Sequence, residues 1–186
     1  MESAPVLRYG ALDRAHLTKH LWRLAKRVGV NRVTMRELAA EAGTRPSSVY
    51  YHVRDKSELL DLLIESVLAQ IEVPQSGDWE TRLTALYTNA WQVLIEVPGI
   101  AGLLQEHPHT AAATEMDRAT RAILRESGLR KQHFEAAHAT LYVHLLGSVQ
   151  LEHRPVGATP DGPNDWAFTY GLRLIINGLR SEIGRP

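Results

Sequence analysis

The segment of residues 34–52 restricts the possible folds of this 186-residue chain more than any other part of it. It reads TMRELAAEAGTRPSSVYYH and places Ala39, Gly43 and Val49 four and six residues apart. A small residue such as Ala39 lets two helices cross closely, and Gly43 can adopt the left-handed backbone of a tight turn without steric cost. Val49 can then pack back on the first of the two helices. This spacing predicts a helix-turn-helix, in which the second helix presents its first residues to the major groove of DNA.

Apolar side chains recur every three or four residues in nearly every other segment, which is typical of amphipathic helices. Capping residues, glycines and prolines divide this pattern into separate helices. We expect helices over residues 13–29, 34–41, 45–52, 55–67, 79–97, 100–105, 110–126, 131–153 and 166–182, and loops over 74–78 and 154–165, the second of them mobile. No alternating strand pattern competes with these helices, so the predicted fold class is all-α with about nine helices.

The formal net charge of zero hides an uneven distribution of charge along the chain. Residues 8–57 contain eleven Lys or Arg and four Asp or Glu, which gives this segment a net charge of +7. The rest of the chain must therefore carry −7. A basic segment can neutralise DNA phosphates and release their counterions. A solvated basic surface without a partner explains the same charge equally well.

Several classes of protein are disfavoured by composition. The chain has no cysteine, which excludes disulfides, thiol catalysis and zinc sites with Cys ligands. No apolar run approaches the roughly 20 residues of a membrane span, and no hydrophobic signal core follows residues 1–5. Glycine-rich phosphate loops, nucleophilic serine turns and metal-ligand constellations are also missing. We therefore expect a cytoplasmic protein that is not an enzyme, has no cofactor or metal and does not bind a membrane.

The run AGTRPSSVYYHVRDKSELLDLLI, residues 42–64, resembles the TetR family of bacterial transcriptional regulators. Its Tyr-Tyr-His, followed by a basic residue, an acid and a lysine, is most similar to the tetracycline-repressor branch. The strong resemblance covers about residues 12–67, and FTYGLRLIINGL near the C-terminus is similar to that branch's last helix. The resemblance implies an N-terminal three-helix helix-turn-helix DNA-binding head over residues 1–57. A helical ligand-binding and dimerisation body over residues 58–186 would follow it.

The resemblance also assigns roles on DNA. Arg36 and residues 45–48 would face base edges, whereas Thr34, residues 50–52 and Lys56 would contact the backbone. Thr34 could instead only cap its helix, and Arg36 could be a solvated charge. We expect one of the two tyrosines to face the core, because adjacent helix positions point about 100° apart. The predicted DNA-binding residues are Thr34, Arg36, Arg45, Pro46, Ser47, Ser48, Tyr50, Tyr51, His52 and Lys56.

The body is expected to enclose a ligand pocket between residues 59 and 142. Such sites are mostly apolar and contain a few polar groups. Each candidate could equally belong to the core or the surface. The candidates for ligand contact are Tyr87, Trp91, Leu94, Leu103, Leu104, Gln105, His107, Met116, His138 and Tyr142.

The last two helices are the expected dimer interface, because the family dimerises through a four-helix bundle of these helices. The interface candidates are Leu141, Leu145, Ser148, Val149, Phe168, Leu172, Ile175, Ile176 and Leu179, although such stripes can also be intramolecular core. The resemblance therefore predicts a homodimeric repressor that binds a palindromic double-stranded operator and is released by an unidentified small-molecule effector. The alternative is a constitutive DNA-binding regulator whose body binds a partner protein and holds no ligand.

Overall fold

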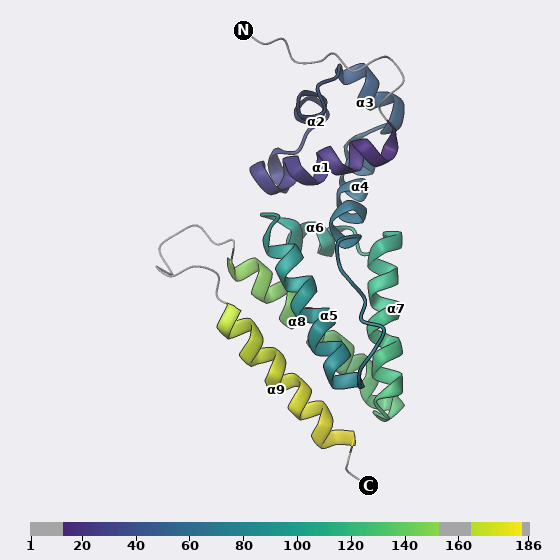
Figure 1. The fold of residues 1–186 in the computed structure, drawn as a ribbon, viewed down its shortest axis with the longest axis vertical. Helices are drawn as coiled ribbons and strands as arrows, with labels where there is room; N and C mark the ends of the chain where they lie inside the picture. The colour runs from purple at the N-terminus through teal and green to yellow at the C-terminus, as the bar shows by residue number, and fades with distance from the viewer. Residues whose placement is uncertain (1–12, 153–164, 184–186) are drawn as a thin grey trace.

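The computed structural model describes residues 13–152 and 165–183, and within these ranges it is helical without strands. The predicted all-α fold is confirmed (Figure 1). The helices are α1 Arg14–Val28, α2 Met35–Glu41, α3 Pro46–His52, α4 Lys56–Leu68, α5 Trp79–Ile95, α6 Ile100–Glu106, α7 Ala111–Glu126, α8 Phe134–Glu152 and α9 Asp165–Ile183, with short 3-10 turns η1 Val30–Arg32 and η2 Lys131–His133. Residues 154–164 of the predicted mobile loop, and the predicted helix end at residue 153, lie outside the described residues.

Side-chain caps set the starts of the helices. Asp13 accepts a hydrogen bond from the backbone N–H of the third residue after it, at 2.7 Å, and Asp55 does the same at 2.9 Å. Asp78 caps α5 in this way at 2.8 Å, and Thr110 caps α7 at 3.3 Å. Each cap satisfies an N–H group that has no partner inside the helix. Local sequence therefore determines where these helices begin.

The turn between α2 and α3 depends on the backbone of Gly43, whose φ is +63°. A Cβ atom placed on this residue would meet nothing within 4 Å. The glycine is therefore required by the left-handed conformation and not by a lack of space. On either side of the turn, Leu38, Ala39 and Val49 are buried and fix the crossing of the two helices.

The molecule has two ends connected by α4 (Figure 1). We call α1–α3 the head and α5–α9 the body. Helix α4 packs on α1 of the head and on α5, α6 and α7 of the body. Within the body, α8 packs on both α5 and α9. None of the described helices combines the length and apolar character that a membrane span requires.

The head also touches the body at the turn between α5 and α6. The backbone N–H of Val30 donates to the carbonyl of Pro98 at 2.8 Å. Gly29 ends α1 with a φ of +77°, and a Cβ atom on it would lie 3.2 Å from the same carbonyl oxygen. Beside this contact, Nζ of Lys26 lies 2.8 Å from Oε2 of Glu96. We call this contact the joint, because it connects head and body independently of α4.

The structure corrects the predicted dimer stripe on α8 and α9. Six of its nine residues are buried within the chain, namely Leu141, Leu145, Val149, Phe168, Leu172 and Ile176. Phe168 shows the reason, because its ring stacks on Trp91 of α5 at a centroid distance of 5.0 Å. These six side chains form the body's own core and are not available to a partner. Ser148, Ile175 and Leu179 are half-buried.

Candidate functional site

Helix α3 is held to the head by a single buried residue, Val49. Tyr50 and Tyr51 are both exposed, at 55% and 87%. The expectation that one of them faces the core is therefore wrong. The helix has only two turns, and its inward positions are taken by Val49 and by Val53 just beyond its end, which is also buried. The rest of α3 forms an outward surface.

Most of the other predicted DNA-binding residues lie on or beside this surface. Arg45, Pro46 and Ser47 at the start of α3 are exposed, whereas Ser48 and His52 are half-buried. The ring of His52 packs against the ring of Tyr51 in an edge-to-face contact at 5.2 Å. The first turn of α3 is therefore accessible to a partner as large as a DNA duplex.

Arg36 and Arg45, like Arg23 and Arg32, are exposed and have no acidic partner among the described residues. Arg27, by contrast, is paired with Glu41, and Arg54 is paired with its neighbour one turn later in α4. A guanidinium group has five N–H donors in a planar fork. The forks of Arg36 and Arg45 are therefore free to bind an external acceptor.

Thr34 and Lys56 lie close to each other at the starts of α2 and α4. Nζ of Lys56 donates a hydrogen bond to the backbone carbonyl of Val33, and burial lowers the pKa of this ammonium group. Oγ1 of Thr34 accepts the backbone N–H of Glu37 at 3.1 Å, so its hydroxyl proton stays available. Lys56 keeps two further protons. Both side chains therefore have a structural bond and spare donors.

A cavity of about 410 Å³ lies in the body. It is enclosed by α4, α5, α7 and α8 and by α6 with the segment after it. Six of the ten predicted ligand residues line it: Tyr87, Leu94, Leu104, Met116, His138 and Tyr142. Its size is within the range of about 300–1,000 Å³ that is usual for small-molecule sites.

The other four candidates lie outside this lining, each for a visible reason. Trp91 stacks on Phe168 and belongs to the core, and Leu103 is buried away from the cavity. Gln105 is exposed. His107 lies on the α6 side that faces α4, where its Nδ1 is 2.7 Å from Oδ1 of Asp61.

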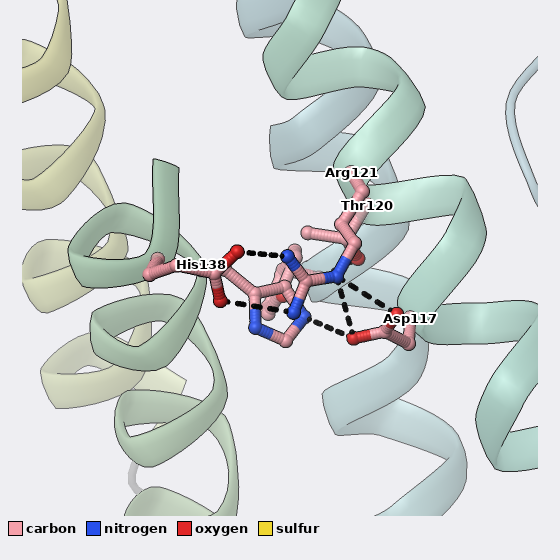
Figure 2. Close-up of polar contacts among 6 residues, drawn as sticks. Asp117, Thr120, Arg121 and His138 are labelled. Atoms are coloured by element: carbon pink, nitrogen blue, oxygen red, sulfur yellow. Dashed lines mark hydrogen bonds and ion pairs between the residues drawn. The ribbon is translucent and has the colours of Figure 1, made fainter. Parts of the chain in front are cut away.

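Sequence reasoning missed most of the polar wall of the cavity, which is formed mainly by α7 (Figure 2). Oδ1 of Asp117 lies 2.9 Å from Nε2 of His138, and Nε of Arg121 donates to both carboxylate oxygens of Asp117, at 3.1 and 2.9 Å. The forked end of Arg121 binds Glu135 through two bonds of 2.7 and 3.2 Å. The spacing of four residues between Asp117 and Arg121 was the one sequence feature that pointed to this wall, but the same spacing is typical of ion pairs on the surface of a helix. The lining residues absent from the prediction are Leu68, Pro108, His109, Ala113, Thr114, Asp117, Thr120, Leu145 and Leu146.

Burial determines the protonation of two groups in this wall. It lowers the pKa of His138, although the neighbouring Asp117 carboxylate acts in the opposite direction. It raises the pKa of Tyr87 to about 12, and the hydroxyl of this residue lies 3.4 Å from Oγ1 of Thr120. Near neutral pH the imidazole is therefore uncharged and the phenol keeps its proton.

The sequence is similar to known regulators in the head and along most of its length. A family model described as bacterial regulatory proteins of the tetR family matches residues 17–63. An HTH-type transcriptional regulator of Saccharopolyspora erythraea is 30% identical over 132 residues, which are 69% of this chain and only 56% of that relative's length. The tetracycline repressor protein class A from transposon 1721 of Escherichia coli is 27% identical over 183 residues, covering 84% of this chain and 85% of the relative.

Solved structures share the fold at lower identity. ActR of Streptomyces coelicolor, a TetR family protein in complex with actinorhodin, superposes with a TM-score of 0.74 at 22% identity over 95% of this chain and all of that chain. BioQ bound to its double-stranded DNA operator superposes with a TM-score of 0.73 at 21% identity over 91% of this chain and 99% of that chain. At this level of identity the match shows a common arrangement of helices.

Proposed function

The chain belongs to the TetR family of bacterial regulatory proteins, and we propose that it is a transcriptional repressor that binds a palindromic operator as a homodimer and is released by a small molecule. The outward surface of α3 carries this proposal. Val49 alone anchors the helix, while Arg45, Tyr50 and Tyr51 are exposed. Exposed arginine and tyrosine side chains on a short second helix suit contact with the major groove and its phosphates.

On this surface we propose a division between base and backbone contacts. Arg36 and residues 45–48 read base edges, where an arginine fork can bond both acceptors of a guanine. Thr34, residues 50–52 and Lys56 hold the phosphates and sugars, and the spare donors of Thr34 and Lys56 support that role. We propose a DNA-binding domain over residues 1–57 and a ligand-binding and dimerisation domain over residues 58–186. The start of α4 at Lys56 supports this boundary.

The homodimer would use the outward faces of α8 and α9 in place of the buried stripe. These faces carry large exposed apolar side chains: Val143, Leu151, Trp166, Tyr170 and Leu174. Ser148, Ile175 and Leu179 of the predicted stripe are half-buried and therefore remain partly accessible. Apolar surface of this kind on a soluble chain is typical of a contact with another protein. A second copy of the chain would also present two heads to two inverted half-sites.

Release by a ligand would act through α4, because this helix packs on both the head and the body. Leu68 at its end lines the cavity. A ligand that prefers one position of α4 must shift the orientation of the head by its difference in affinity for the two states. The cavity also favours a small molecule over a partner protein as the effector, because its volume of about 410 Å³ suits a small ligand.

Selection of the full chain on a random double-stranded DNA library tests the proposal. We expect the enriched sequences to contain two inverted half-sites about one helical turn apart, or a multiple of that spacing. Arg36→Ala should then relax the preference at one base position, whereas Lys56→Ala should weaken all sequences alike and reduce the salt slope by about one. Enrichment without an inverted repeat, or equal loss of specificity from both variants, contradicts the proposal.

A further inference from the structure

The cavity has walls of two different kinds. Apolar side chains form most of its surface, and four helices contribute leucines to it: Leu68, Leu94, Leu104 and Leu145. The polar wall is the pair of Asp117 and His138, with the Tyr87 hydroxyl and Thr120 beside it. We propose that the cavity selects amphipathic amines, whose protonated amino group binds Asp117 and His138 while an apolar body fills the rest. This inference rests on the proposed function only in treating the bound molecule as the effector.

The contacts of the pair favour a donor on the ligand. Without a proton on Nε2 of His138, the lone pair of this atom would face Oδ1 of Asp117 at 2.9 Å, so the imidazole proton is assigned to Nε2. Nδ1 is then an acceptor, and no described residue donates to it. Oδ2 of Asp117 accepts one bond, from Arg121, and keeps further acceptor capacity. The pair therefore offers acceptors on both of its members and no spare donor.

The charges around the pair favour a cation. Arg121 directs its forked end at Glu135 and reaches Asp117 only through Nε. Two carboxylates therefore share one guanidinium, and with a neutral His138 the group has a net charge of −1. The polar and titratable groups around His138 are Asp117, Thr120 and Arg121 on α7, Tyr87 on α5, Glu135 and Tyr142 on α8, and His109 before α7.

Ligands of other charge lack one or both of these interactions. A carboxylate or phosphate ligand would place its acceptors against acceptors and its charge against a net negative group. A neutral alcohol can donate a hydrogen bond but adds no charge. A protonated amine supplies both, and charge-assisted hydrogen bonds are about twice as strong as neutral ones.

Three fluorescent probes with one common apolar body separate these cases. Pyrenemethylamine, pyrenemethanol and pyrenecarboxylic acid differ only in the group that would face Asp117. We expect titration of the full chain to give an affinity for the amine that exceeds that for the alcohol by about tenfold or more. The acid should bind most weakly. Equal affinities, tighter binding of the acid, or no binding of the amine overturns the proposal.

Substitution of Asp117 tests whether the polar wall causes the preference for the amine. Asp117→Asn keeps the shape and removes the charge, so the amine should lose its advantage over the alcohol while the alcohol binds as before. Glu115→Gln is the matched control, because Glu115 lies on the same helix but pairs with Arg118 outside the cavity lining. A preference that survives Asp117→Asn overturns the assignment. Binding of pyrenemethanol also reports that the variant is folded.

The pH dependence gives a second readout. Protonation of His138 would convert Nδ1 into a donor and cancel the net negative charge. Lowering the pH from about 7.5 to about 5, across the usual titration range of a histidine, should therefore weaken binding of the amine and not of the alcohol. His138→Gln should remove most of this dependence. A steeper loss in the alcohol than in the amine would contradict the proposed contact.

A separate measurement distinguishes this proposal from the proposed function. Probes that bind without preference for the amine end the inference but leave ligand-controlled DNA binding intact. If the amine binds with the expected preference but does not change the mobility shift of a selected DNA duplex, the proposed release fails while the ligand class stands.

Discussion

The head and the body use arginine in opposite ways. In the head, Arg36 and Arg45 are exposed and have no acidic partner among the described residues. In the body, Arg121 is bonded to two carboxylates, and its side chain is half-buried where those of Arg36 and Arg45 are exposed. Arg36 and Arg45 are therefore available to an external acceptor, unlike Arg27 of the same head, whereas the guanidinium of Arg121 is bonded within the body. Exposed, unpaired arginines suit contact with a large partner, whereas a polar wall held by internal bonds suits contact with a small ligand.

The largest effect should come from the hydrophobic core, which runs from the head through α4 into the body. Leu38 in the head and Leu86 in the body are both fully buried, and truncation of either to alanine should cost about 2–5 kcal/mol of unfolding free energy. Because α4 and the joint connect the two regions, we expect urea unfolding of each variant to remain a single transition. Two separate transitions in Leu38→Ala, with only the first shifted, would show that the head unfolds alone.

Arg45 should affect DNA binding without affecting stability. Arg45→Ala should weaken binding to a selected duplex by about 1–3 kcal/mol, because an unpaired fork is lost from the first turn of α3. The thermal midpoint should not change. Arg27→Ala is the control, since that arginine is already paired with Glu41. A mobility-shift titration in which both variants lose equal affinity would break the contrast between paired and unpaired arginines.

Two glycines with empty surroundings should respond with opposite signs. A Cβ atom on Gly43 or on Gly102 would meet nothing within 4 Å, but only Gly43 has a positive φ. Gly43→Ala should destabilise the protein by about 1 kcal/mol because of the left-handed backbone. Gly102→Ala, inside α6, should stabilise it by about 0.5–1 kcal/mol. Thermal unfolding measures both changes in stability. A change of the same sign in the two variants would contradict the role given to the positive φ of Gly43.

The smallest effect concerns pH and belongs to the body. The pKa of His138 is lowered in the folded protein, so the unfolded chain binds the proton more readily. Stability from this group is therefore complete above about pH 6.5, the ordinary histidine value, and is lost as the pH falls through the lower folded pKa. Thermal midpoints measured across this range should fall more in the wild type than in His138→Gln. Parallel curves would show that His138 does not contribute.

More of the head than of the body could be predicted from the sequence, because the caps and the turn of the head depend on residues that are neighbours in the chain. Asp13, Thr34 and Asp55 cap their helices as the sequence indicates, and Gly43 forms the expected turn. The error at the tyrosines arose because the inward positions of this two-turn helix are taken by Val49 and by Val53 just beyond its end.

The polar wall and the interface of the body could not be predicted in the same way, because they depend on contacts between residues far apart in the sequence. Asp117 and His138 are 21 positions apart and meet only because α7 packs on α8. Their spacing has no helical period, so no pattern in the sequence identifies the pair. The apolar stripe on α8 and α9 was visible, but periodicity does not distinguish a face that packs on α5 from one that meets another chain.

The joint between Val30 and Pro98 has a consequence for the exchange of parts between related proteins. Its hydrogen bond joins one backbone to another, and Gly29 is the residue whose Cβ would press on that carbonyl. Gly99 lies beside Val30 on the other side of the joint and has a φ of +88°. A chimaera built from a foreign head and this body would therefore need a glycine and a free N–H at this joint, in addition to an α1 that packs on α4. Recombined regulators with new DNA specificity should keep both contacts.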